Sequence, residues 1–253
     1  MVDIPEDHPR YESLVLRKKV EKALDEGILA KAGLIAHGRG EAFDYLLGEK
    51  TTKPALKSIR AACAHLLCAE HPVISVNGNT AALVPEKIIT LSQVVPAFLE
   101  INLFYKTQER VKAIHRKLTS IDANITILGA DPNYAERIPG LSSRRGEVDR
   151  RGIYKGDVIL VALEDGDRTE ALKRMGKFVI AIDLNPLSRT AQYADITIVD
   201  NVVRTVPAMI STVKEMKSLS DLSTYEFDNR ANLRSSIHEM ITYLSTYFKE
   251  VIQ

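Results

Sequence analysis

The sequence predicts an α/β fold: a doubly wound, mostly parallel sheet of about six strands, with an N-terminal helical segment and a C-terminal helix. Two short β-branched runs, 179–182 and 196–199, are continuously apolar. Such runs are typical of strands buried on both faces of a sheet. Strand and helix patterns alternate along most of the chain. This alternation favours a parallel sheet that is covered by helices on both faces.

The first 70 residues are expected to form a helical segment that packs on the core. Leucines and valines recur at helical spacing over 11–26, and a glycine follows as a stop. A short second helix is expected over 29–35, and an alanine-rich helix over 53–69. Between these two, the stretch 37–48 places an arginine between glycines, and we expect it to enter a helical turn.

The α/β core is expected over 71–217, and 218–253 should form a linker and a final helix, all within one structural domain. The remaining strand patterns lie at 73–76, 97–103, 125–129 and 158–163, and the helical patterns at 87–95, 107–118, 168–175, 206–216 and 233–248. By contrast, the polar and basic run 142–151 is too charged for a sheet.

The charge balance and hydropathy limit the classes of partner. The chain carries 34 Lys and Arg residues against 33 Asp and Glu, a formal net charge of +1. A balanced surface argues against a sequence-independent electrostatic hold on nucleic acid. The N-terminus lacks the pattern of a secretion signal, and no apolar run approaches the ~20 residues that cross a bilayer. A cytoplasmic protein without a membrane partner is therefore expected.

Polar side chains gather where the predicted strands end. Right-handed crossovers place the carboxyl ends of parallel strands on one edge of the sheet, where ligands of doubly wound folds bind. The polar groups expected at this edge are Asn77, Gly78 and Asn79, then Asn102, Asp131, Glu164 to Asp167, Asp183 and Asn185, and Asp200 and Asn201. The alternative interpretation is that the Asn-Pro and Asp-Asn pairs only form turns and helix caps.

Several familiar signatures are absent from the sequence. It contains neither a phosphate-binding Gly-x-x-x-x-Gly-Lys-Ser/Thr loop nor a dinucleotide Gly-x-Gly-x-x-Gly motif. The nearest match, Gly38-Arg39-Gly40, lacks the third glycine. The six histidines are scattered without acidic or cysteine partners at ligand spacing, and there is no Gly-x-Ser-x-Gly elbow. These observations argue against nicotinamide, zinc and serine-nucleophile chemistry.

The remaining candidate residues indicate a site that binds an anion. Between two glycines, Arg39 could grip a phosphate while the neighbouring amides approach the ligand; a solvated arginine in a loop is the alternative. The turn Asn77-Gly78-Asn79 can both donate to and accept from hydroxyls or carbonyls. The acidic loop 164–167 could cap a helix, or hold a metal or an amine. Arg137 could close over a phosphate or lie in a solvated basic loop.

Four stretches together resemble a known family. They are 37–46 (HGRGEAFDYL), 74–85 (ISVNGNTAALVP), 163–168 (LEDGDR) and 180–191 (IAIDLNPLSRTA). They resemble the archaeal phosphopantothenate synthetases, which are the 4-phosphopantoate–β-alanine ligases of coenzyme A biosynthesis. The likeness is collinear over about 4–215; the part beyond 218 does not align and is expected to serve packing or dimer contact.

The resemblance implies a Rossmann-like homodimer that catalyses an ATP-dependent ligation. The carboxylate of phosphopantoate would attack the α-phosphate of ATP, and the amine of β-alanine would then displace AMP from the acyl adenylate. Arginine and Mg²⁺ would neutralise the negative charges that this attack brings together. The ATP-binding residues implied by the resemblance are Arg17, Arg39, Asp183, Leu184, Asn185, Ser188, Arg189, Asp200 and Asn201.

Within that set, we assign Arg39 to the triphosphate as the catalytic cation, and Arg17 beside it. Phosphopantoate is assigned to Asn77, Gly78, Asn79 and Arg137. Neither metal ligands nor a general base can be identified. Two alternative functions stay open: an ATP-dependent amide ligase for another phosphorylated hydroxy acid, and a non-catalytic regulatory domain that binds a nucleotide or a phosphosugar.

Overall fold

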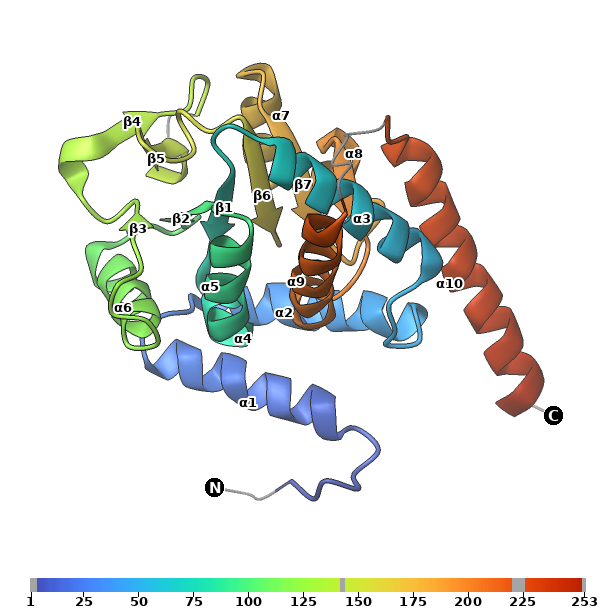
Figure 1. Ribbon diagram of the computed structural model, residues 1–253. Helices are drawn as coiled ribbons and strands as arrows, with labels where there is room; N and C mark the ends of the chain where they lie inside the picture. The colour runs from blue at the N-terminus through green and yellow to red at the C-terminus, as the bar shows by residue number, and fades with distance from the viewer. Residues whose placement is uncertain (1–3, 142–143, 220–225, 252–253) are drawn as a thin grey trace.

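The computed structural model describes residues 4–141, 144–219 and 226–251 and contains a six-stranded parallel sheet (Figure 1). The strands are β1 (Val73–Val76), β2 (Phe98–Ile101), β3 (Ile127–Leu128), β6 (Val158–Ala162), β7 (Phe178–Ile182) and β8 (Ile196–Ile198). Their order across the sheet is β3-β2-β1-β6-β7-β8, and every neighbouring pair is parallel. The predicted α/β fold with a doubly wound sheet is confirmed.

The helices frame this sheet and supply the predicted N-terminal segment and C-terminal helix. They are α1 (Tyr11–Asp25), α2 (Lys31–Leu46), α3 (Lys53–Cys68), α4 (Gly78–Leu83), α5 (Pro85–Val94), α6 (Gln108–Thr119), α7 (Gly166–Arg174), α8 (Arg189–Tyr193), α9 (Val202–Ser218) and α10 (Asn229–Val251). Side-chain oxygens cap several N-termini: Thr52 accepts from the Ala55 amide, and Thr107 from the Arg110 amide. Among the described helices, none is long and apolar enough to cross a membrane.

Alternate residues of the central strands β6 and β7 belong to different core clusters on the two faces of the sheet. In β7, Ile180 and Ile182 belong to the larger core cluster, which includes residues of α3, α5 and α9. Val179 and Ala181 belong to the other cluster, which includes Ala171 and other residues of α7. The continuous apolar runs therefore reflect burial on both faces, as the sequence predicted.

A two-stranded antiparallel sheet was not predicted. It pairs β4 (Ala135–Arg137) with β5 (Glu147–Asp149), so the expectation that the run 142–151 is too charged for a sheet is wrong for 147–149; 142–143 lie outside the described residues. Val148 is buried, while the flanking Glu147 and Asp149 are paired with Lys106 and Arg151. These two carboxylates are tolerated in the strand because each forms an ion pair.

The second helix is also longer than expected. We predicted a helix over 29–35 and a separate helical turn within 37–48, but α2 is one continuous helix to Leu46 that includes the whole glycine-flanked stretch around Arg39. Contacts with α1, α4 and α10 stabilise α2 and outweigh the helix cost of about 1 kcal/mol per glycine. In Figure 1, α2 crosses below the arrowheads of the sheet, at the edge where the strands end.

The strand order reverses between β1 and β6, which are adjacent although a long segment of chain separates them. At such a point the connections leave in opposite directions and open a crevice at the carboxyl ends of the strands. In this protein the opening at the reversal point lies between the strand ends and α2.

Candidate active site

A cavity of about 440 Å³ lies at the reversal point of the sheet. Its polar wall comes from the residues that follow three strands: Asn77 after β1, Asn102 after β2 and Glu164 after β6. Residues of α2 and the preceding turn, among them Leu29 and Ala36, form an apolar wall. The polar edge predicted from the sequence therefore borders a real cavity.

The turn after β1 both builds and lines this cavity. Asn77 ties the two central strands together, since its Nδ2 donates to the carbonyl of Ala162 at 2.6 Å. Its Oδ1 accepts from the amide of Thr80 at 3.0 Å and so caps α4. At position 78 a Cβ would lie 2.8 Å from the carbonyl of Ile28, so only glycine fits there. Asn79 is buried, and its Oδ1 has no hydrogen-bond partner.

Arg39 projects from the middle of α2 and lines the same cavity. Its neighbouring amides are engaged within the helix, so the expectation that they approach a ligand is wrong. The side chain is exposed, and no ion pair joins it to any residue that the structure describes. An uncompensated guanidinium at a cavity mouth suits an anionic group.

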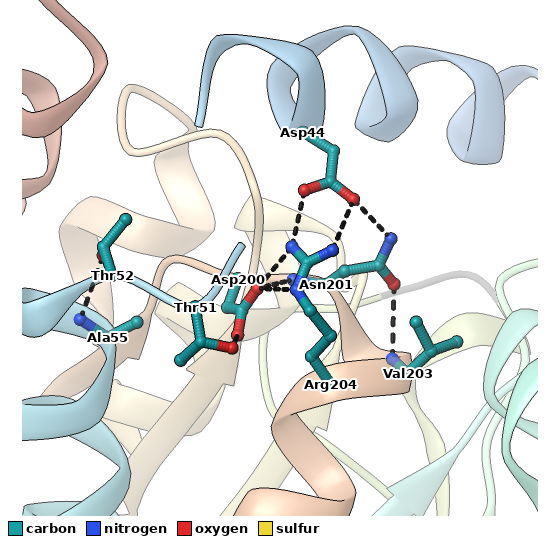
Figure 2. A network of polar contacts seen from close by, with 8 residues as sticks. All are labelled: Asp44, Thr51, Thr52, Ala55, Asp200, Asn201, Val203 and Arg204. Carbon is teal, nitrogen blue, oxygen red and sulfur yellow. Dashed lines mark hydrogen bonds and ion pairs between the residues drawn. The ribbon is translucent and has the colours of Figure 1, made fainter. Parts of the chain in front are cut away.

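Asp200 and Asn201, which follow β8, belong to a separate polar network (Figure 2). Arg204 donates to Asp44 Oδ1 through Nη2 at 2.5 Å and to Asp200 Oδ1 through Nε at 2.8 Å. Thr51 donates to Asp200 Oδ2 at 2.6 Å, and Asn201 donates to Asp44 Oδ2 at 2.8 Å. Burial raises the pKa of Asp200, although the charge of Arg204 opposes this shift. The network joins α2 to the start of α9.

A narrow crevice separates this network from the larger cavity. It measures about 20 Å³, and α2 lines it through His37, Gly40 and Glu41. Leu184, Asp200 and Asn201 line its other side, and Leu163 borders both the crevice and the cavity. The structure therefore brings three of the predicted ATP-binding residues together in one crevice, whereas Arg39 lines the neighbouring cavity.

The turn after β7 is closed by its own side chains. The carboxylate of Asp183 accepts from the amide of Asn185 at 2.9 Å and from Ser188 Oγ at 2.5 Å. Ser188 also caps α8 by accepting from the amide of Ala191. Burial raises the pKa of Asp183. These contacts are those of the turn-and-cap alternative, and they hold the turn in one conformation beside the crevice.

The remaining predicted arginines lie outside the cavity. Arg189, at the start of α8, pairs with Asp167 at 2.5 Å and with Glu170 at 2.8 Å. Arg137 lies on β4 in register with Glu147 and lines neither the cavity nor the crevice. The structure thus does not bring Arg137 together with the turn 77–79.

Arg17 is held by Glu41, the acidic residue two positions after Arg39 in the sequence. Glu41 Oε2 accepts from Arg17 Nη2 at 3.0 Å, and Glu41 also accepts from Ser13 and from the hydroxyl of Tyr45. These donors outweigh the effect of burial and lower the pKa of Glu41 to about 2. The pair places Arg17 on the α1 side of α2, next to the crevice that Glu41 lines.

Arg110 is the main lining residue that sequence reasoning missed. It occupies the first turn of α6, following its cap Thr107, and its guanidinium reaches the cavity. A cation in the first turn of a helix is disfavoured by the helix dipole. That unfavourable position was the one signal in the sequence that could have drawn attention to it.

The fold and the site together define a class: a doubly wound α/β protein with an arginine-lined cavity at the reversal point of its sheet. Comparison with known proteins narrows this class to a family. Residues 54–243 match the model of the phosphopantothenate/pantothenate synthetase family. The chain belongs to the phosphopantothenate/pantothenate synthetase family.

Several relatives carry the name 4-phosphopantoate–β-alanine ligase. The Thermococcus kodakarensis protein is 61% identical over 220 residues, covering 87% of this chain and 84% of the relative. The Methanosarcina mazei protein is 49% identical over 256 residues, covering 99% of each chain. The Methanospirillum hungatei protein is 51% identical over 201 residues, covering 79% of this chain and 81% of the relative.

Proposed function

We propose that this protein is an ATP-dependent 4-phosphopantoate–β-alanine ligase of coenzyme A biosynthesis. The observation that carries the proposal is the 49% identity to the Methanosarcina mazei ligase over 99% of both chains. A cavity with uncompensated arginines at the reversal point of the sheet suits its anionic substrates.

The reaction proceeds in two displacements. A carboxylate oxygen of phosphopantoate bonds to the α-phosphorus of ATP, and the bond from that phosphorus to pyrophosphate breaks. The amine nitrogen of β-alanine then bonds to the acyl carbon and loses a proton, while AMP leaves with its phosphate oxygen. Both reactants of the first step are anions, so Arg39 at the cavity mouth lowers the barrier by neutralising charge.

The nucleotide is proposed to lie along the carboxyl edge between β6 and β8. Its base would enter beside Leu184, Asp200 and Asn201, and its phosphates would reach Arg39 and Arg17. The crevice beside these residues now has room for about one water. Binding therefore requires α2 to move away from the turn after β7. The turn held by Asp183 and Ser188 would stay fixed as the opposite wall, with Asn185 and Arg189 at its rim.

Mg²⁺ is proposed to enter with the nucleotide. No group of three or more His, Cys, Asp or Glu side chains that could share a metal ion occurs within the described ranges. An Mg²⁺ ion that is held mainly by phosphate oxygens and water, as is common at nucleotide sites, does not need such a group of protein ligands. The arginines of the site would act together with it on the triphosphate.

A homodimer is proposed as the assembled form. The outer part of α10 exposes Ile241, Tyr247 and Phe248, whose exposed fractions are 56%, 46% and 53%. Large apolar side chains that cluster on one exposed element are typical of contact surfaces between subunits. In Figure 1 this end of α10 extends away from the sheet.

The test is a product assay with ATP, 4-phosphopantoate and β-alanine. We expect AMP and pyrophosphate to form only when phosphopantoate is present, and the amide product to require β-alanine. Product formation with only a different phosphorylated hydroxy acid would favour a ligase of another specificity. Tight nucleotide binding without pyrophosphate release from any hydroxy acid would instead identify a regulatory domain.

A further inference from the structure

Two arginines reach the cavity at the reversal point from different elements. Arg39 comes from α2 and Arg110 from α6. The acidic lining residues are already engaged: Glu164 Oε2 lies 3.5 Å from Arg168, and Asp165 caps α7. No ion pair joins either lining arginine to any residue in the described part of the chain. The walls of the cavity therefore offer neither lining arginine an ion-pair partner among the described residues.

Arg110 is fixed in place although its charge is unpaired. Its Nη1 donates to the carbonyl of Tyr105 at 2.5 Å, and its Nη2 donates to the carbonyl of Ile28 at 3.1 Å. The Nε atom is buried and has no hydrogen-bond partner. Two backbone carbonyls thus orient the guanidinium without neutralising its charge, and its Nε–H donor remains without a partner in the described structure. An arginine keeps its proton even when it is partly buried.

The adjoining residues of the turn after β1 leave room for a ligand beside this arginine. A Cβ at Gly78 would lie 3.1 Å from Arg110 Nη2, so glycine lets the guanidinium pass close to the backbone. Asn79 lines the same cavity, is 7% exposed, and has an unpartnered Oδ1. The cavity therefore offers an unsatisfied acceptor as well as unsatisfied donors, which suits a ligand with a hydroxyl and an anionic group.

The order of the strands orients such a ligand. The crevice assigned to the nucleotide lies at the ends of β7 and β8, whereas Arg110 follows β2. Three strand spacings separate β2 from β7, about 14 Å. An acid whose carboxylate reacts near Arg39 and the nucleotide must direct its other end toward α6. In 4-phosphopantoate, the phosphate lies at the end opposite to the carboxylate.

We propose that Arg110 binds the phosphate of the acid substrate, with Asn79 accepting from its hydroxyl. Arg110 then sets the preference for the phosphorylated over the unphosphorylated acid. This inference rests on the proposed ligase function, and it adds a specificity residue at the end of the cavity away from ATP.

The test measures binding of 4-phosphopantoate and of pantoate to the wild type and to Arg110→Gln. We expect phosphopantoate affinity to fall about 10- to 100-fold, the usual loss for a charge-assisted hydrogen bond. Pantoate has no phosphate, so its affinity should be unchanged, as should that of ATP. The preference between the two acids should therefore largely disappear in the variant. Arg116→Gln, on an exposed position of the same helix, is the matched control.

A purely structural role for Arg110 predicts a different outcome. Loss of its bonds to the carbonyls of Ile28 and Tyr105 would weaken binding of both acids equally, and that result would overturn the inference. Unchanged phosphopantoate affinity in Arg110→Gln would also overturn it, while ligase activity of the wild type would leave the proposed function standing. If Arg110→Gln does not fold, Arg110→Lys decides: selective weakening of phosphopantoate supports the inference, and equal weakening of both acids refutes it.

Discussion

An arginine at the mouth of the cavity carries a charge that takes no part in an ion pair within the described structure. Arg39 is exposed on α2 and has no ion-pair partner in the parts of the chain described, whereas Arg17 and Arg189 are each held by carboxylates. An unpaired arginine is ready for an incoming anion, while a paired one must first exchange its carboxylate for phosphate. Of these three arginines, Arg39 is therefore the one most available to an incoming anion.

Arg39→Ala is therefore expected to impair catalysis more than folding. Removing a preorganised donor from a developing charge typically lowers the rate about 100- to 1000-fold, so kcat/KM for ATP should fall by that order. The thermal midpoint should change little because the side chain is exposed. The measurements are steady-state kinetics and calorimetry, with Arg234→Ala on α10 as the control. Intact ATP binding and turnover in Arg39→Ala would show that the triphosphate assignment is wrong.

Glu41 links stability to pH at the contact of α1 with α2. The pKa of its carboxyl is about 2 in the folded protein because Ser13, Tyr45 and Arg17 donate to the ionised form, whereas the ordinary value is 4.5. A depressed carboxyl pKa stabilises the fold above the ordinary value, and this contribution is lost as the pH falls toward the folded value. The stabilisation is about 1–2 kcal/mol, because solvent screens the half-exposed Arg17.

Glu41→Gln should lower the free energy of unfolding at neutral pH by that amount. The difference from the wild type should narrow as the pH falls from 5 to 2, because the wild-type carboxyl becomes protonated there. Urea denaturation across this range measures both curves. The exposed Glu12→Gln on α1 is the control and should follow the wild type. A stability difference that is independent of pH would contradict the assigned pKa.

Among the elements, α2 departs most from the sequence prediction. The sequence predicted a helix over 29–35 and a separate helical turn within 37–48, yet α2 continues through both because contacts with α1, α4 and α10 stabilise a continuous helix. Local preference was overridden by packing that only the folded chain supplies. The consequence for function is that one continuous helix lines both the cavity and the crevice.

The helical state of this stretch can be tested with Gly38→Ala. A Cβ at position 38 meets nothing within 4 Å, so alanine should raise the free energy of unfolding by about 0.5–1 kcal/mol. Gly27→Ala is the matched comparison: it also has open space, but its φ of 71° disfavours any side chain. That variant should be less stable than the wild type. Destabilisation by Gly38→Ala would indicate that α2 is interrupted there.

Across the whole molecule, one polar network joins the N-terminal helices to the far end of the sheet. Asp44 of α2 and Asp200 after β8 share Arg204, and their side chains are only 7% and 0% exposed. Two buried carboxylates without their cation would repel each other and lack solvation. The network thus joins α2 to the start of α9 beside the crevice by a contact between residues 160 positions apart in the chain.

Removing that cation should weaken the fold as a whole. Arg204→Met is expected to lower the free energy of unfolding by about 3 kcal/mol, as for other broken buried pairs. In the double variant with Asp44→Asn, part of this loss should return because one uncompensated carboxylate is gone. Chemical denaturation of both variants, with Lys214→Met on the exposed side of α9 as control, measures the effect. Wild-type stability of Arg204→Met would show that the network contributes nothing.

The sequence by itself determined the fold class and the polar edge. Apolar runs such as 179–182 can only be satisfied by burial on both faces, and parallel strands bring their carboxyl ends to one edge. The positions of Asn77 and Asp200 at that edge were therefore predictable. The resemblance of collinear motifs gave the family, which the comparisons confirm.

Only the folded chain shows which of these polar groups line the cavity or the crevice and which are engaged in holding the fold together. Asp183 and Asp200 are engaged in a turn and in an ion network, and Arg110 reaches the cavity from a helix that no motif marks. Such pairings join residues that are distant in sequence, so no local pattern encodes them. The reason is physical: burial and charge compensation depend on neighbours that only the folded chain brings together.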